Sequence, residues 1–153
     1  MSYSFQNPSA EVIESYLKSA KTIAIIRTGF LNNDAMFVSH RKEAASYQVA
    51  HFLQAAGYRI IPVNPKLEGQ ELLGEHVYAY LKDIPFSIDI VDVFRRSEFL
   101  PDVAYDFLET DAKVFWSQIG LENEEAETIL RQANRQDIVM NRCTKIEYMR
   151  LFV

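Results

Sequence analysis

The stretch IDIVDVFRRS at residues 88–97 sets the pattern that organises the whole chain. Its first part is short, apolar and rich in β-branched residues, as expected of a buried strand, and its last part is polar and basic. Similar apolar runs that end in polar or turn residues recur along the sequence. The predicted strands are Thr22–Ile26, Tyr58–Val63, Ile88–Val93, Lys113–Trp116 and Asp137–Met140.

Most of these strands are separated by stretches with apolar residues at three- and four-residue spacing, which predicts helices. Such stretches cover residues 47–56, 103–108 and 126–133, and further helices are expected at Ser9–Ala20 and Thr144–Leu151. Strands that alternate with helices indicate a parallel sheet covered by helices on both faces. The predicted fold is therefore an α/β three-layer sandwich with a five-stranded, mainly parallel sheet.

Composition limits the classes of protein that the chain can represent. A length of 153 residues with 48% hydrophobic content predicts one globular domain over residues 1–153. A net charge of -5 argues against a nucleic-acid partner, and the single cysteine, Cys143, excludes an intrachain disulfide. Neither a membrane-length apolar run nor a signal-peptide pattern is present in the sequence, so we expect a cytoplasmic protein without a membrane partner.

Ligands of open parallel sheets bind beyond the carboxyl ends of the strands, where helix N-termini offer free amides. Several of the residues that follow the predicted strands are basic, although the chain is acidic. Guanidinium groups suit phosphate because they donate two hydrogen bonds at once, so this edge predicts an anion site. The candidate residues for binding a cofactor are Arg27, Thr28, Gly29, Asn64, Pro65, Lys66, Phe94, Arg95, Arg96, Ser97, Gln118, Gly120, Asn141 and Arg142. Ser97 is also expected to cap the helix that follows it.

Other ligand classes lack their expected motifs. A nicotinamide dinucleotide site would show G-x-G-x-x-G after the first strand and an acidic residue after the second, and the sequence has neither. His40, His51 and His76 are not at metal-ligand spacing, so no metal site is expected. The segment Arg27–Lys42 is a long loop without a clear period, which indicates either a functional or a disordered segment.

Several strings resemble one family in the same order along the chain. They are GYRIIPVNPK at 57–66, LGEHVYAYLKDIP at 73–85, IDIVDVFRRSEFLPDV at 88–103, VFWSQIGLENEEA at 114–126 and DIVMNRCTKIEY at 137–148. From about Lys21 to Leu151 the chain resembles standalone coenzyme A (CoA) binding domains, which are similar to the N-terminal domain of succinyl-CoA ligase alpha subunits. The resemblance implies a Rossmann-like domain that holds the adenosine diphosphate part of CoA at the strand ends. Its matching positions are Asn64, Pro65, Phe94, Arg95, Arg96, Ser97, Gln118, Gly120, Asn141, Arg142 and Cys143.

The first loop departs from the family pattern. Family members run from the first strand into a short Gly-x-Ser turn and then an Arg-Pro-Ser-Tyr-like segment. Here the strand runs into Arg27-Thr28-Gly29, and a longer loop precedes Ala45-Ser46-Tyr47. Either Gly29 lets backbone amides approach a diphosphate or this part of the site is weakened.

The sequence thus favours a module that binds CoA or acyl-CoA without catalysis, alone or with a protein partner. No catalytic residue is predicted, because no nucleophile–base pair stands out. The alternatives are a component of a nucleotide-fold enzyme, related to NAD(P) enzymes or acyl-CoA ligases, and an interaction domain that has lost CoA. Cys143 lies where it could form a mixed disulfide with the CoA thiol, or it is a reduced buried cysteine.

Overall fold

The fold is known from a computed structural model that describes residues 2–27 and 40–153. Among these residues, five parallel strands form the main sheet in the order β2-β1-β5-β6-β7. They are β1 (Thr22–Arg27), β2 (Arg59–Val63), β5 (Ile90–Phe94), β6 (Val114–Ser117) and β7 (Ile138–Val139). The predicted strands are confirmed, and their ends shift by one or two residues.

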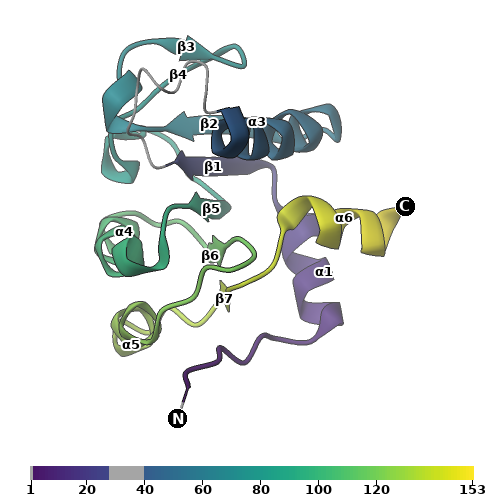
Figure 1. Ribbon diagram of the computed structural model, residues 1–153, viewed down its shortest axis with the longest axis vertical. Coiled ribbons are helices and arrows are strands. Elements are labelled where there is room, and N and C mark those ends of the chain that lie inside the picture. Colours follow the sequence, from purple (N-terminus) through teal and green to yellow (C-terminus); the bar gives the residue numbers. More distant parts are fainter. Residues whose placement is uncertain (1, 28–39) are drawn as a thin grey trace.

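Helices cover both faces of this sheet (Figure 1). The described helices are α1 (Ala10–Ser19), α3 (His40–Ala55), α4 (Leu100–Leu108), α5 (Glu124–Gln132) and α6 (Thr144–Phe152). α4 and α5 lie on one face, and α1, α3 and α6 lie on the other. The α/β Rossmann-like prediction is therefore confirmed. No helix in the described ranges is long and apolar enough to span a bilayer.

The two cores explain why the strand sequences are continuously apolar. Along β1, Ala24 and Ile26 join the hydrophobic cluster beneath α4 and α5, whereas Ile23 and Ile25 join the cluster beneath α1, α3 and α6. Successive side chains of a strand point to opposite faces, so a sheet buried on both faces needs apolar residues at every position. An acidic residue inside such a strand needs a separate explanation, and Asp92 of β5 is one.

The strand order of the main sheet reverses at one point. From β1 the chain moves to β2 on one side, and it later returns to β5 on the other side of β1. Doubly wound sheets bind ligands where the order reverses in this way, outside the carboxyl ends of the strands. The reversal here lies between β1 and β5.

The connection from β2 to β5 differs from the other crossovers, because no α-helix forms in it. Its main feature is a short hairpin of β3 (Glu71–Leu72) and β4 (Glu75–His76). A bridge between Val63 and Tyr78 then covers the outer edge of β2. Two short 3₁₀ helices, Pro65–Leu67 and Leu81–Asp83, complete the connection.

The segment Arg27–Lys42, expected to be a loop, is only partly described. Arg27 is the last residue of β1, and 40–42 belong to the start of α3. The remaining residues, 28–39, include the candidates Thr28 and Gly29 and lie outside the described residues.

Candidate functional site

The candidate residues divide between two parts of the carboxyl edge of the sheet. Arg27 and Asn64, at the ends of β1 and β2, line one small pocket with a volume of about 30 Å³. The residues that follow β5, β6 and β7 are joined instead by hydrogen bonds between their loops. The parallel sheet therefore brings the described candidates to one edge, as the sequence predicted.

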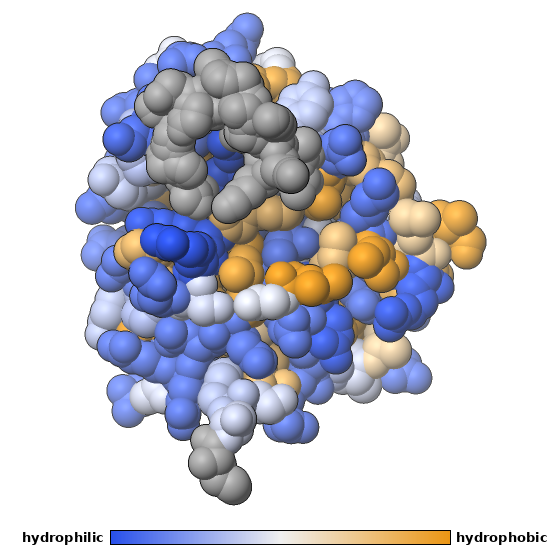
Figure 2. Space-filling view, in the orientation of Figure 1, coloured by the Kyte–Doolittle hydropathy of each residue, from blue (hydrophilic) through white to orange (hydrophobic). Residues whose placement is uncertain are grey.

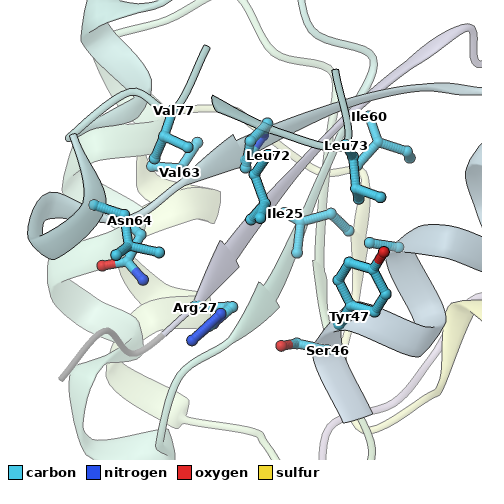
Figure 3. A pocket seen from close by; sticks show the side chains of 13 residues that line it. Ile25, Arg27, Ser46, Tyr47, Ile60, Val63, Asn64, Leu72, Leu73 and Val77 are labelled. Carbon is cyan, nitrogen blue, oxygen red and sulfur yellow. The ribbon is translucent and has the colours of Figure 1, made fainter. Parts of the chain in front are cut away.

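The pocket at β1 and β2 is lined mainly by apolar side chains, with a few polar ones. Its apolar lining includes Ile25 and Ile60 of the strands and Leu72 and Leu73 of the hairpin. Figure 3 shows the side chains of Arg27 and Asn64 on one side and those of Ser46 and Tyr47 on the other. Ser46 and Tyr47, from α3, belong to the segment that resembles the family's Ser-Tyr pair. No pattern in the sequence pointed to the hairpin residues as part of a site.

Asn64 points a hydrogen-bond donor into this pocket. Its side chain is 3% exposed, and its Oδ1 accepts the backbone N–H of Lys66 at 3.0 Å. That bond fixes which end of the amide is oxygen. The Nδ2 group donates to no other residue in the described part of the chain. A buried amide donor without a protein acceptor costs free energy, so this group favours a ligand acceptor.

Arg27 places a positive charge beside the Asn64 amide. Burial lowers the pKa of the Arg27 guanidinium below its ordinary value, because the charged form is partly removed from water. Arginine nevertheless keeps its proton in proteins. An anionic ligand near Arg27 would offset this cost of burying the charge.

Past β5, the basic residues lie at the surface. The guanidinium carbon of Arg95 lies 4.5 Å from the ring centre of Phe99. Arg96 pairs with Glu98 at 3.8 Å, and both of these side chains are well exposed.

Ser97 does not cap the following helix, contrary to expectation. Its hydroxyl donates to the carbonyl of Gly120 and accepts the N–H of Glu122, which ties the β5 loop to the β6 loop.

The loops after β6 and β7 are also tied together. The N–H of Gly120 donates to Oδ1 of Asn141 at 2.6 Å, and the N–H of Arg142 donates to the carbonyl of Ser117. Asn141 has a φ of 61° and Gly120 a φ of 86°, so both residues shape tight turns. The guanidinium of Arg142 donates to the carbonyl of Asn141. These contacts give Gly120, Asn141 and Arg142 structural partners, and their part in ligand binding stays a prediction.

A buried polar cluster lies beneath this edge, on the face that α6 covers. Asp92 is fully buried. Its carboxylate accepts one hydrogen bond from Nε2 of Gln118 at 2.6 Å and another from the Thr144 hydroxyl at 2.8 Å. Burial raises the pKa of Asp92 to about 7, against the two hydrogen bonds, which lower it. Gln118, predicted to bind the cofactor, is thus buried and bonded to Asp92. Asp92 and Thr144 were not among the predicted candidates, and their hydrogen bonds emerge only from the structure.

The remaining candidates have simple positions. Pro65 and Lys66 are exposed residues of the 3₁₀ turn after β2, and Phe94 packs partly buried beneath α3 and α6. Cys143 is partly buried at the start of α6. The described chain contains no group of three or more His, Cys, Asp or Glu residues placed to hold a metal ion.

Comparisons with known proteins find relatives that match nearly the whole chain. The chain is 45% identical over 143 residues to the Bacillus subtilis protein YneT, covering 94% of this chain and 96% of that one. A solved structure from Thermus thermophilus, cell-free ID.343, is 34% identical with a TM-score of 0.80, and the match covers 95% of this chain and all of that one. A hypothetical protein from Pyrococcus horikoshii OT3 is 29% identical with a TM-score of 0.81, over 99% of this chain and 100% of that one.

One family model matches most of the chain. It is described as a CoA binding domain, and it matches residues 38–149. This range contains the described candidates at the ends of β2, β5, β6 and β7. The chain therefore belongs to the family of CoA-binding domains.

Proposed function

We propose that the chain binds CoA or acyl-CoA through the adenosine diphosphate moiety, at the carboxyl ends of β1, β2 and β5. The observation that carries this proposal is the pocket where the Arg27 guanidinium and the Asn64 amide donor face the same space. Phosphate and ribose oxygens accept hydrogen bonds from such groups. Membership of the CoA-binding family supports CoA as the nucleotide.

The position of the basic residues supports the same location. Arg27 ends β1, and Arg95 and Arg96 follow β5, so these three residues flank the point where the strand order reverses. A diphosphate at this point has guanidinium groups on both sides. We propose that at least one of Arg95 and Arg96 contacts phosphate.

We further propose that this chain binds its ligand without catalysing a reaction alone. The groups named above are donors for an anion, and they supply neither a nucleophile nor a general base. A protein partner that acts on the bound ligand is compatible with this role.

The experiment is a thermal-shift panel with CoA, dephospho-CoA, acetyl-CoA, NAD and ATP. A ligand at about 100 times its dissociation constant adds about 2.7 kcal/mol to the unfolding free energy, which raises Tm by about 5–10 °C at this size. We expect this shift with CoA and not with NAD. A shift with NAD alone would replace the proposal with a dehydrogenase-type function, and no shift with any nucleotide would favour an interaction domain.

A further inference from the structure

Asp92 differs from nearly all other described acidic residues because it has no access to water. The face in Figure 2 is mainly hydrophilic, and charged side chains there lie in water, where salt screens them. Among the described acidic residues, only Asp92 and Glu147 are buried, and Glu147 pairs with Arg150 at 3.5 Å. The partners of Asp92 are neutral, namely the Gln118 amide and the Thr144 hydroxyl. An ionised Asp92 is therefore a buried charge without a counter-ion.

Asp92 and the pocket at β1 and β2 lie on the same face of the sheet. In the parallel register, Asp92 of β5 is the neighbour of Ile25 of β1. Ile25 lines the pocket, and so does Arg27, two residues further along β1 (Figure 3). Ile25 and Ile90 both belong to the cluster beneath α1, α3 and α6. Side chains two residues apart on a strand share a face, so Asp92 points to the same side of the sheet as Ile90.

The proposed anion site is close enough for the charge of Asp92 to act on it. Neighbouring strands lie about 4.8 Å apart, and two residues along a strand span about 6.6 Å, so the backbones of Asp92 and Arg27 are about 8 Å apart. A phosphate that pairs with Arg27 would therefore lie about 10 Å from Asp92. At an effective dielectric constant near 20, two unit charges at this distance change an equilibrium on the order of tenfold. Because Asp92 is buried, salt screens this interaction less than it screens surface charges.

The other ionisable groups on this face do not compensate the charge of Asp92. In the described chain they are Tyr16 of α1, Arg27 of β1, Tyr47 of α3, Tyr58 before β2, Arg142 and Cys143 before α6, and Lys145, Glu147 and Tyr148 of α6. None of them bonds to Asp92 or contributes to the shift of its pKa. Burial raises that pKa to about 7, and the two hydrogen bonds lower it. Asp92 is therefore free to gain or lose its proton near neutral pH.

We propose that protonation of Asp92 regulates the binding site, so that CoA binds more tightly when this buried carboxyl is neutral. The inference rests on the proposed function, because it requires a phosphate beside Arg27. A bound anion disfavours the ionised carboxylate, so binding raises the pKa of Asp92 and the protein takes up protons. By linkage, the protonated form prefers the ligand by the same factor. CoA affinity is therefore highest below about pH 7 and falls as the pH rises through the pKa of Asp92.

Isothermal titration calorimetry with CoA at pH 6, 7 and 8 tests the inference on the wild type and on Asp92→Asn. Asparagine has the same shape, and its oxygen can accept the Gln118 amide, so the variant removes a charge from a side chain too buried to touch the ligand. For a tenfold preference of CoA for the protonated form, the two affinities should be nearly equal at pH 6, and the variant should bind about fivefold more tightly at pH 8.

The ratio of these two affinities reports on Asp92, because the phosphates of CoA titrate alike in both experiments. A ratio that stays constant from pH 6 to pH 8 would overturn the inference and leave CoA binding intact. Failure of both proteins to bind CoA at any pH would instead overturn the proposed function, and the inference with it.

Asp89→Asn is the control for net charge, because it removes the same single charge at the opposite end of the segment. Asp89 accepts the N–H groups of Lys21 and Thr22, and these bonds help to lower its pKa, so it is ionised at pH 8. Asp89→Asn should bind CoA at pH 8 with the affinity of the wild type. A gain as large as that of Asp92→Asn would show that total charge governs binding, and it would overturn the inference.

Thr144→Val carries the test if Asp92→Asn does not fold. Valine keeps the shape of Thr144, which is fully buried, but it removes a hydrogen bond that favours the ionised form of Asp92. The pKa of Asp92 should rise further, so the fall in CoA affinity should begin at a higher pH than in the wild type. A fall at the same pH in both proteins would overturn the inference.

Discussion

At the scale of single residues, Asp92 joins three segments of the candidate site. Asp92 lies in β5, and its carboxylate accepts hydrogen bonds from Gln118, which follows β6, and from Thr144, which begins α6. No cation contributes to its pKa in the described structure, so burial dominates and the protonated form persists to about pH 7. Asp92 therefore joins these segments, but its ionised form lowers the stability of the fold, so the stability should depend on pH.

Replacing Asp92 with Asn should remove this pH dependence. The folded-state pKa is raised from 3.8 to about 7, so the stabilising effect of protonation is complete below about pH 4 and is lost as pH rises through 7. The unfolding free energy of Asp92→Asn minus that of the wild type should increase by about 2–3 kcal/mol when the pH is raised from 5 to 8. Urea unfolding at both pH values measures the difference.

Asp89→Asn is the matched control at the other end of the same segment. Partial burial alone would raise the pKa of Asp89, but the N–H groups of Lys21 and Thr22, together with Lys113, lower it. Its contribution to stability is thus present above the unfolded-state pKa and is lost only in acid. The difference between Asp89→Asn and the wild type should stay constant from pH 5 to pH 8. A constant difference for Asp92→Asn as well would show that Asp92 is ionised throughout this range.

The sequence predicts some of these residues better than others. Arg27 and Asn64 are predicted as candidates because they follow buried apolar runs, and the position after a parallel strand decides which edge a residue reaches. Asp92 interrupts an apolar run, but its partners lie 26 and 52 residues away. A linear pattern cannot show which distant side chains meet, so the Asp92 cluster needed the structure.

Asn64→Asp tests whether the buried amide contacts the ligand. The variant keeps the oxygen that accepts the Lys66 N–H, but it replaces the donor in the pocket with a second oxygen. We expect CoA affinity to fall about tenfold to hundredfold, as for loss of a hydrogen bond to a charged group. Asn134→Asp makes the same change at an exposed residue that is not among the site candidates and should leave affinity unchanged. Equal affinities for both variants would remove Asn64 from the site.

At the scale of elements, the N-terminal segment protects the edge of the sheet. β7 is a short edge strand, and exposed edges invite pairing with other chains. Nδ2 of Asn7 donates to the carbonyl of Met140 at 2.8 Å, and the N–H of Met140 donates to Oδ1 of Asn7 at 3.1 Å. One side chain thus makes the two hydrogen bonds that another strand would make.

Asn7→Ala should destabilise the fold. It leaves the backbone groups of Met140, a buried residue, without these partners, at a cost of about 2 kcal/mol or about 4–8 °C in Tm. The neighbouring Gln6→Ala removes only an exposed contact of 3.4 Å to the Ser4 carbonyl and should have little effect. Differential scanning calorimetry measures both variants. If Asn7→Ala melts with the wild type, water replaces the lost bonds and the N-terminal segment does not protect the edge.

The β3–β4 hairpin shows why one element escaped prediction. Each strand has two residues, too few to show an alternating pattern. Its turn has Leu73 at a φ of 53°, where hairpins usually have Asn or Gly. Gln54 of α3 donates to the Leu73 carbonyl, and Leu73 also lines the pocket. Tertiary contacts therefore hold a turn that local sequence preference would not choose.

At the scale of the whole molecule, the sequence predicts layers but not the arrangement of strands. Alternation of strands and helices was enough for a parallel sheet with two covered faces. It did not show that β1 lies between β2 and β5, because strand order depends on which apolar surfaces pack together over the full chain. That order decides that Arg27 has Asn64 on one side and the Arg95 loop on the other.

The net charge of the whole molecule and the charges near the site act on ligand binding in opposite directions. The chain carries a net charge of -5 and is proposed to bind an anion, so the general field opposes binding while nearby arginines favour it. At 0.15 M ionic strength, charges are screened beyond about 8 Å. Binding should therefore depend on arginines at the site and not on total charge.

Three variants separate these effects, because Arg95→Ala, Arg96→Ala and Arg131→Ala each change the net charge from -5 to -6. Arg131 lies on α5 and pairs with Glu127, among residues that are not site candidates. At least one of the Arg95 and Arg96 variants should lose about tenfold to hundredfold in CoA affinity, whereas Arg131→Ala should lose none. Calorimetric titration with CoA measures the affinities, and melting curves show whether each variant folds. Equal losses in all three would mean that the general field governs binding, and no loss at Arg95 or Arg96 would leave these two residues as a solvated edge.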